Sequence, residues 1–130
     1  MKQMLYTGIN IQYPISRLIS SRTKVVETRT YPLPKNLVGQ DLVIIETPGK
    51  GGDFKARMIG LVAFGESFKY HSKAEFYADI ERHCVEPDSP WAWQEGKGKW
   101  GWPILKVTLF KKPTPLQKRA GIVYSKGIRL

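Results

Sequence analysis

Glycine and proline break this chain into short segments. The 130 residues contain 12 glycines and 9 prolines, and both residue types disfavour the interiors of regular elements. The segments between them are rich in apolar and β-branched residues, which is typical of strands. We therefore expect four to six strands, within one of which Gly60 and Gly65 indicate a bulge or a close backbone approach. The predicted strands cover residues 5–11, 24–29, 41–47, 56–66, 103–109 and 120–125.

Two short helices are expected among these strands. Pro14 suits the first turn of a helix, and the apolar residues after it predict a helix that ends at about Ser21. Ser72 and Glu75 have the spacing of a capping box, which predicts a second helix over residues 73–84. Strands with two inserted helices favour one α+β domain over the whole chain, built as a small β-barrel with two or more peripheral helices.

Composition excludes several classes of protein. Apolar residues make up 42% of the chain, which is too many for an intrinsically disordered protein. No apolar run approaches the roughly 18–20 residues of a membrane span, and the N-terminal residues lack the apolar region of a signal peptide. The single cysteine, Cys84, excludes an internal disulfide and is too few for a cysteine-based zinc site. We expect a soluble, cytoplasmic domain without a metal, a cofactor or a membrane.

Positive charge is concentrated at the C-terminal end of the sequence. Residues 1–95 contain 12 basic and 11 acidic residues, whereas residues 96–130 contain 9 basic residues and no acidic one. This asymmetry favours a surface that faces a polyanion, because each neutralised phosphate releases condensed counterions. Since nucleic acid is the commonest polyanion, we expect RNA or a single-stranded nucleic acid as the partner. The alternative is a solvated basic face that only aids solubility.

A lysine, a glutamate and an arginine lie within six residues of each other. Lys24 is able to act as a base or nucleophile where desolvation or a nearby cation lowers its pKa. Glu27 suits proton transfer or orientation of the lysine, and the fork of Arg29 suits a phosphate or carboxylate. On an ideal strand Glu27 and Arg29 share a face, so Lys24 joins them only if it lies on the turn before the strand. The alternative is a two-sided surface strand with a modest ion pair.

Four tryptophans form a second cluster, interleaved with Lys97 and Lys99. Bases stack on indole faces while lysines follow the phosphate backbone, and each stacked base contributes about 1–3 kcal/mol. The cluster is therefore interpreted as a nucleic-acid surface, to which Tyr13 and Tyr31 add ring faces. The alternative is that at least two of the indoles belong to the core. The tryptophans are Trp91, Trp93, Trp100 and Trp102.

A longer motif surrounds the charged trio. It consists of a short helix, the pattern Gly/Ser-x-x-Lys-x-Val-Glu-x-Arg and an aromatic–proline turn, formed here by Ser21, Lys24, Val26, Glu27, Arg29, Tyr31 and Pro32. This motif resembles the ASCH domain family of the PUA-like superfamily, nearest the subgroup of the endothelial-overexpressed lipopolysaccharide-associated factor. Further similarity lies at residues 11–14, 58–66, 100–102, 113–115 and 118–122, so the resemblance covers about residues 5–125.

The resemblance implies a PUA-like barrel with a cleft that is lined by the trio and binds RNA or a modified nucleoside. Some members of the family look like ribonucleases, and one subgroup hydrolyses N4-acetylcytidine. In that subgroup the catalytic lysine falls on Lys24, its threonine partner falls on Glu27, and a third residue, a glutamate, corresponds to Glu66. A glutamate cannot replace that hydroxyl unchanged, which is a departure from the amidohydrolase pattern.

The first hypothesis of function is a nucleotide-binding cleft. Lys24 and Arg29 would contact a phosphate or a base edge, Glu27 would orient them, and Trp100 or Trp102 would stack on the base.

In this hypothesis the basic C-terminal residues guide the nucleic acid strand. They include Lys97, Lys99, Lys118 and Arg119.

Two alternatives remain. One is a metal-independent ribonuclease or nucleoside amidohydrolase, in which Lys24 is base or nucleophile and Glu27 or Glu66 is its proton partner. The other is a protein-interaction adaptor, in which the tryptophan-rich loop docks a protein.

Overall fold

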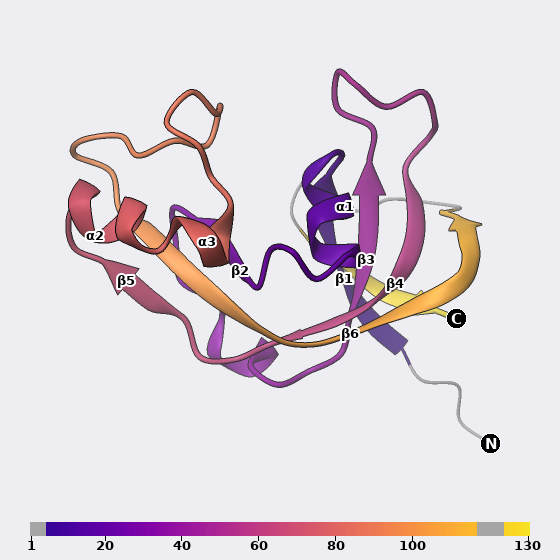
Figure 1. Cartoon of the computed structure of the whole chain (residues 1–130). Coiled ribbons are helices and arrows are strands. Elements are labelled where there is room, and N and C mark those ends of the chain that lie inside the picture. The colour runs from indigo at the N-terminus through magenta and orange to yellow at the C-terminus, as the bar shows by residue number, and fades with distance from the viewer. Residues whose placement is uncertain (1–4, 117–123) are drawn as a thin grey trace.

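One seven-stranded sheet forms most of the domain (Figure 1). The computed structural model describes residues 5–116 and 124–130. Its strands are β1 (Leu5–Gln12), β2 (Val26–Arg29), β3 (Leu42–Thr47), β4 (Arg57–Phe64), β5 (Phe68–Tyr70), β6 (Lys99–Pro115) and β7 (Tyr124–Arg129). Its helices are α1 (Ile15–Ser20), α2 (Lys73–Ala78) and α3 (Ile80–His83), with a 3₁₀ turn, η1, at Lys35–Leu37. The predicted α+β class is confirmed.

The sheet is open within the described residues. Its strands follow the order β2–β6–β4–β3–β1–β7, and β5 also pairs with β6. β1 and β3 run parallel, and the other pairs are antiparallel. The path therefore ends at β2 and at β7, and the closed barrel expected from the sequence stays a prediction.

The long strand β6 connects the two halves of the molecule. From Lys99 to Pro103 it pairs with β2 on one side and β5 on the other. From Ile104 to Pro115 it pairs with β4. Figure 1 shows β2, β5, α2 and α3 toward one end of β6, and α1, β1, β3 and β4 toward the other.

The strands predicted from the sequence agree with the structure, with two kinds of exception. Next to a proline the predicted strand boundary is wrong, and the shortest strand shows too little pattern to be predicted. The strands expected at residues 5–11, 41–47 and 56–66 are confirmed within two residues. The strand expected at 103–109 is longer at both ends, from Lys99 to Pro115. Pro103 does not begin it, because this proline lies within the strand as the register partner of Val26, and its carbonyl oxygen also accepts a hydrogen bond from the Gly65 N–H at 2.8 Å.

Two further differences concern the shortest strands. The three-residue strand β5 was not predicted. Of the strand expected at residues 120–125, residues 120–123 lie outside the described part, and β7 continues to Arg129.

The helix predicted over residues 73–84 is divided at Asp79. Ser72 caps α2 as expected, because its Oγ accepts from the Glu75 N–H at 3.0 Å. The carboxylate of Asp79 then accepts hydrogen bonds from the hydroxyl of Tyr70 and from the guanidinium of Arg82, which hold the chain at the break. After α3 the chain turns at Cys84, whose φ of 62° is left-handed.

Apolar side chains cover both faces of the sheet. The larger cluster includes Ile44, Phe64 and Trp102, and a smaller cluster on the opposite face includes Val43 and Ile45 of the same strand β3. A third cluster, made of Tyr70, Phe76 and Val85, packs beneath α2 and α3. In residues 5–116 and 124–130, no helix has the length and apolar character needed to cross a membrane.

Candidate functional site

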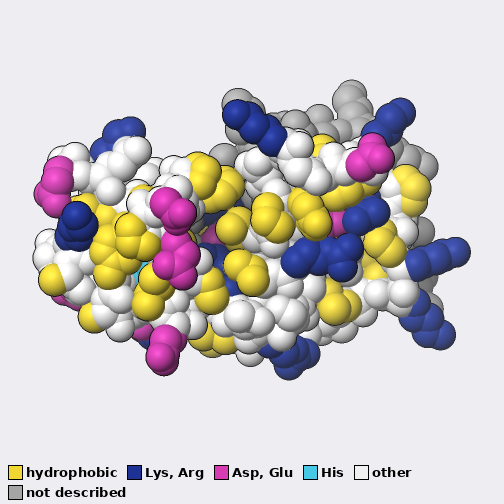
Figure 2. Space-filling view, turned by 45° about the horizontal axis from the view of Figure 1, so that its top comes forward, with side chains coloured by type: hydrophobic (Ala, Val, Ile, Leu, Met, Phe, Trp, Pro, Cys, Tyr) yellow, Lys and Arg dark blue, Asp and Glu magenta, His cyan; other side chains and the backbone are white. Residues whose placement is uncertain are grey.

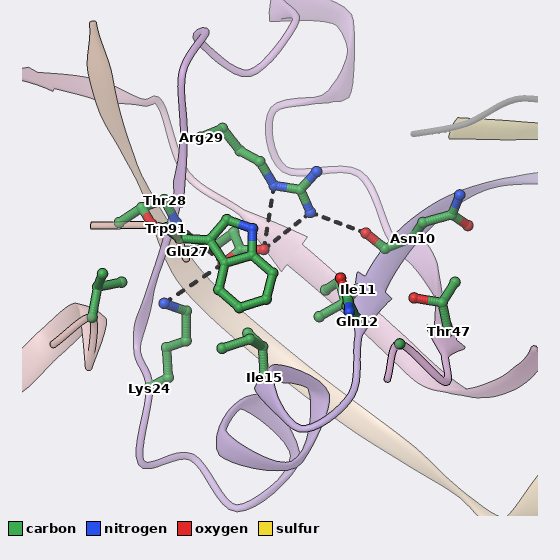
Figure 3. A pocket seen from close by; sticks show the side chains of 12 residues that line it. Asn10, Ile11, Gln12, Ile15, Lys24, Glu27, Thr28, Arg29, Thr47 and Trp91 are labelled. Carbon is green, nitrogen blue, oxygen red and sulfur yellow. Dashed lines mark hydrogen bonds and ion pairs between the residues drawn. The ribbon is translucent and has the colours of Figure 1, made fainter. Parts of the chain in front are cut away.

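A pocket of about 420 Å³ opens between the two halves of the molecule. Figure 2 shows this face hollowed between its two sides. One wall is formed by β2, the turn before it and the segment after α3, and the other by β1, α1 and the end of β3. The lining residues, drawn in Figure 3, are Asn10, Ile11, Gln12, Ile15, Lys24, Glu27, Thr28, Arg29, Thr47, Gly49, Val85 and Trp91.

Lys24 reaches the pocket because it lies on the turn before β2. The strand begins at Val26, and the N–H groups of Thr23 and Lys24 both donate to the Leu18 carbonyl at 3.0 Å. The alternation of a strand therefore does not apply at Lys24. Its Nζ lies 3.6 Å from Oε1 of Glu27 (Figure 3). Lys24 therefore joins Glu27 and Arg29, as the sequence predicts for a lysine on the turn before the strand.

The carboxylate of Glu27 is buried between two cations. Its Oε2 accepts from Nε and Nη2 of Arg29 at 3.3 and 3.0 Å, and its Oε1 accepts from the Thr28 N–H at 3.1 Å. Burial acts to raise the pKa of Glu27, but the charges of Arg29 and Lys24 outweigh it and hold this pKa below its ordinary value. Glu27 is therefore ionised at neutral pH.

Burial changes the acid–base behaviour of Lys24. Its side chain is 1% exposed, and its Nζ also donates to the carbonyl of His83. Burial lowers the pKa of Lys24 below its ordinary value, and the opposing effect of Glu27 does not cancel this. A buried lysine with a lowered pKa has the chemical character of a base or nucleophile.

Arg29 links the two walls of the pocket. Its Nη2 donates to the carbonyl of Asn10 on β1 at 3.0 Å, and its Nη1 donates to the hydroxyl of Tyr31 at 3.3 Å. Its guanidinium carbon lies 5.4 Å from the centre of the Trp102 indole, which is a cation–π distance. The Arg29 side chain keeps 16% of its surface exposed, so it is both anchored and accessible.

Trp91 supplies the accessible aromatic ring of the pocket. It is 38% exposed and belongs to the segment between α3 and β6. Lys99 holds this segment, because its Nζ donates to the Trp91 carbonyl at 2.8 Å. In the view of Figure 3 the indole lies in front of Glu27, with Lys24 beside it. The pocket therefore combines fixed charges with one aromatic face.

His83 fixes the wall behind Lys24. Its Nε2 donates to the carbonyl of Phe76 at 2.6 Å, and its Nδ1 accepts from the N–H of Val85 at 2.9 Å. The ring is also stacked on Phe76, with 4.1 Å between centroids. Burial lowers the pKa of His83, which favours the neutral ring that this arrangement requires. The same residue presents its carbonyl to Lys24.

Two predicted binding residues belong to the interior. Trp102 is fully buried and its indole N–H donates to the Tyr31 carbonyl at 3.2 Å. With no exposed surface, Trp102 is not accessible for stacking on a base in this structure, which leaves Trp100 as the other residue predicted to stack. Lys99 is 6% exposed and bonded to the Trp91 carbonyl, so it is not the exposed phosphate contact that we expected.

The other predicted residues lie outside the pocket lining. Glu66 is exposed on the connection between β4 and β5, away from the trio, and Lys97 is exposed near the start of β6. Tyr13, Tyr31 and Trp100 are half-buried.

Two predicted contacts, Lys118 and Arg119, lie outside the described residues.

Sequence reasoning missed the residues that β1 and β3 contribute. Asn10, Gln12 and Thr47 line the wall opposite the trio. No local motif marks Asn10 or Thr47, and Gln12 lies in the stretch 11–14 that resembles the family but was not among the predicted site residues. Trp91 belongs to the tryptophan cluster of the sequence, but the residues predicted to stack on a base are Trp100 and Trp102. The proline-flanked, acidic segment around Trp91 was the available signal, since residues 86–95 contain no large aliphatic residue beside which the indole would be buried.

Within the described residues, no group of three or more His, Cys, Asp or Glu side chains is placed to hold a metal ion. The sequence matches no protein-family model, and no curated protein matches it. The resemblance to the ASCH family therefore stays a prediction.

Proposed function

We propose that the pocket binds one nucleoside unit, either free and modified or as an unpaired nucleotide of RNA. The observation that carries this proposal is the meeting of Arg29, Lys24 and Glu27 with the accessible ring of Trp91 around one cavity. A ring face suits the flat surface of a base, and an anchored guanidinium suits a phosphate or a base edge.

The size and lining of the pocket support this ligand class. Its volume of about 420 Å³ is at the lower end of the roughly 300–1,000 Å³ of small-molecule sites. Ile11, Ile15 and Val85 add apolar surface, while Gln12 and Thr47 add hydrogen-bonding groups. Flat apolar surface with a few polar groups at its edge is what a nucleobase presents to its binding site.

Isothermal titration calorimetry with nucleosides and nucleoside 5′-monophosphates tests the proposal. Ribose 5-phosphate is the control ligand that lacks a base. We expect binding of at least one base-containing ligand, weakened about tenfold by Trp91→Ala, because stacking contributes about 1–3 kcal/mol. Trp91→Phe keeps a ring and should restore most of the affinity. Failure of the folded protein to bind any of these ligands at millimolar concentration would overturn the proposal.

A hydrolase is the second candidate, and it is favoured by the lowered pKa of the buried Lys24. In this case Lys24 acts as base or nucleophile on a bound nucleoside and Glu27 exchanges the proton. The test is incubation with RNA and with N4-acetylcytidine in the presence of EDTA. Turnover that Lys24→Met abolishes would support hydrolysis. Binding without turnover would reject it and leave the binding function in place.

A further inference from the structure

Outside the largely buried trio, the two rims of the pocket carry opposite charge. We call residues 85–95 the acidic lip, since they contain Glu86, Asp88 and Glu95 and no basic residue. We call residues 13–17 and 48–57 together the basic lip, since they contain four basic residues and one acidic one. Both lips adjoin the pocket, because the first carries its lining residues Val85 and Trp91, and the second carries Ile15 and Gly49.

The difference in charge between the two lips lies in exposed side chains. All three acidic side chains of the acidic lip are exposed, and so are Lys50 and Lys55 of the basic lip. Figure 2 shows acidic side chains gathered on the half that carries α2 and α3, and basic side chains on the half that carries α1 and β4. A phosphate backbone is therefore repelled from one side of the pocket and attracted to the other.

The basic lip also carries two aromatic rings. Tyr13 and Phe54 meet edge to face at 5.7 Å between centroids. The guanidinium carbon of Arg57 lies 3.9 Å from the centre of the Phe54 ring, and that of Arg17 lies 6.0 Å from the centre of the Tyr13 ring. Both tyrosine and phenylalanine are half-buried. Rings supported by cations next to a binding pocket form a platform of the kind on which bases stack.

Buried Glu46 keeps this arrangement in place. Its Oε1 accepts from Nε of Arg57 at 2.8 Å, and its Oε2 accepts from the hydroxyl of Ser16 on α1 at 2.5 Å. The carboxylate offsets part of the charge of Arg57, at 2.8 Å, and of Arg17, at 4.0 Å, so the attraction for an anion comes mainly from the exposed loop lysines Lys50 and Lys55.

The basic surface continues away from the pocket along β6. Arg57 pairs with Pro115 in the sheet, so the C-terminal part of β6 lies beside the basic lip. Lys111 and Lys112 of that part are exposed. A strand of nucleic acid that leaves the pocket over the basic lip thus meets further positive charge at the end of the molecule.

We propose that a single-stranded nucleic acid crosses the pocket by one defined route. One base occupies the pocket, the phosphate backbone leaves over the basic lip, and the neighbouring base stacks on the Tyr13–Phe54 platform. This inference rests on the proposed nucleoside-binding function. The paired rings favour a nucleic acid over an acidic peptide, because every base offers a flat face to stack and an acidic side chain offers none.

Fluorescence anisotropy with a labelled seven-nucleotide RNA tests the route, with nucleoside monophosphate binding measured in parallel. The double variant K50E/K55E reverses two exposed charges on the basic lip. The matched control K69E/K73E makes the same change in net charge with two exposed lysines of β5 and α2, on the other half. We expect K50E/K55E to weaken RNA binding about tenfold and to reduce the salt slope by about 0.7 for each phosphate that the variant no longer neutralises. The control should change affinity less than twofold.

Phe54→Leu tests the platform, because it keeps apolar volume and removes the ring. We expect it to weaken RNA binding about fivefold and to leave monophosphate binding unchanged.

Four outcomes would overturn the route. The first is an equal effect of the two double variants on RNA affinity, and the second is RNA binding that is no tighter than monophosphate binding. The third is RNA binding that Phe54→Leu leaves unchanged. The fourth is an unlabelled acidic peptide that displaces the labelled RNA as well as unlabelled RNA does. Absence of binding by both RNA and monophosphate is different, because it would overturn the nucleoside-binding function itself.

Discussion

Glu27 is the residue on which the charged trio depends. Its carboxylate contacts both Lys24 and Arg29, and all three side chains are largely removed from water. A buried charge costs several kcal/mol when its partner is removed. The two cations differ, however, because Arg29 also bonds to Asn10 and Tyr31.

Replacement of Glu27 should therefore cost more stability than replacement of Lys24. We expect Glu27→Gln to lower the free energy of unfolding by about 3 kcal/mol, because it leaves two cations buried without a carboxylate. Lys24→Met should cost about 1 kcal/mol, since Glu27 keeps Arg29 and the main loss is a hydrogen bond to His83. Urea denaturation measures both. A larger loss for Lys24→Met would contradict this account of the trio.

His83 should make the domain sensitive to mild acid. Burial lowers the pKa of His83 in the folded protein, whereas in the unfolded chain it has the ordinary value of about 6.5. Below pH 6.5 the unfolded chain therefore binds more protons than the folded one, so stability falls as the pH falls. We expect a loss of about 1 kcal/mol between pH 7.5 and 5.5.

The variant His83→Gln isolates this effect. It should show a smaller loss of stability over the same pH interval, whatever its stability at pH 7.5. His71→Gln is the matched control, because His71 is exposed, and it should keep the pH dependence of the parent protein. Equal pH dependence in His83→Gln and the parent would exclude His83 as the sensor.

At the scale of elements, the sequence predicted the strands with a local hydrophobic pattern. Residues 41–47 are an apolar run between glycine and proline, and β3 matches this run closely. β5 has three residues and exists because Phe68 packs against Gly101 of β6, which is a contact between distant parts of the chain. The break at Asp79 likewise depends on Tyr70, so the capping motif alone predicted one helix.

The bulge expected near Gly60 is confirmed. The register of β4 shifts next to Gly60 against both β3 and β6. A Cβ at this position would lie 2.5 Å from the carbonyl oxygen of Thr108 and 3.0 Å from Cα of Leu109, both of which are backbone atoms. The neighbouring strand therefore approaches too closely for any side chain.

Gly60→Ala should lower the free energy of unfolding by about 2 kcal/mol, because the two strands must separate to admit the methyl group. Gly51→Ala is the control. The nearest atom to a Cβ there is 3.9 Å away, on the ring of Tyr13, so we expect a change within about 0.5 kcal/mol. Thermal unfolding of both variants measures the difference, and similar stability of the two would argue against the close approach.

At the scale of the whole molecule, only one wall of the pocket was predictable from sequence. Lys24, Glu27 and Arg29 are neighbours in the chain, so their chemistry was visible as a motif. Gln12 and Thr47 reach the pocket through the pairing of β1 with β3, where they are register partners. Whether an aromatic residue belongs to the core or lines a pocket also depends on that packing, so the sequence pattern did not distinguish the buried Trp102 from the exposed Trp91.

The two halves that form the pocket should unfold together. β6 pairs with strands of both halves, and the largest core cluster combines Trp102 from one half with Ile9 and Ile44 from the other. Neither half keeps this core alone, so we expect one cooperative transition. All four tryptophans lie in residues 91–102, so their fluorescence reports on one half, while hydrogen exchange of β1 and β3 reports on the other.

The free energies from tryptophan fluorescence during urea denaturation and from exchange of the slowest β1 and β3 amides should therefore agree within about 1 kcal/mol. Gly60→Ala, which acts on the half without tryptophans, should lower both values equally. If Gly60→Ala lowers the exchange free energy but leaves the fluorescence midpoint constant, the two halves unfold independently. A pocket between independent halves would lose the fixed geometry on which nucleoside binding depends.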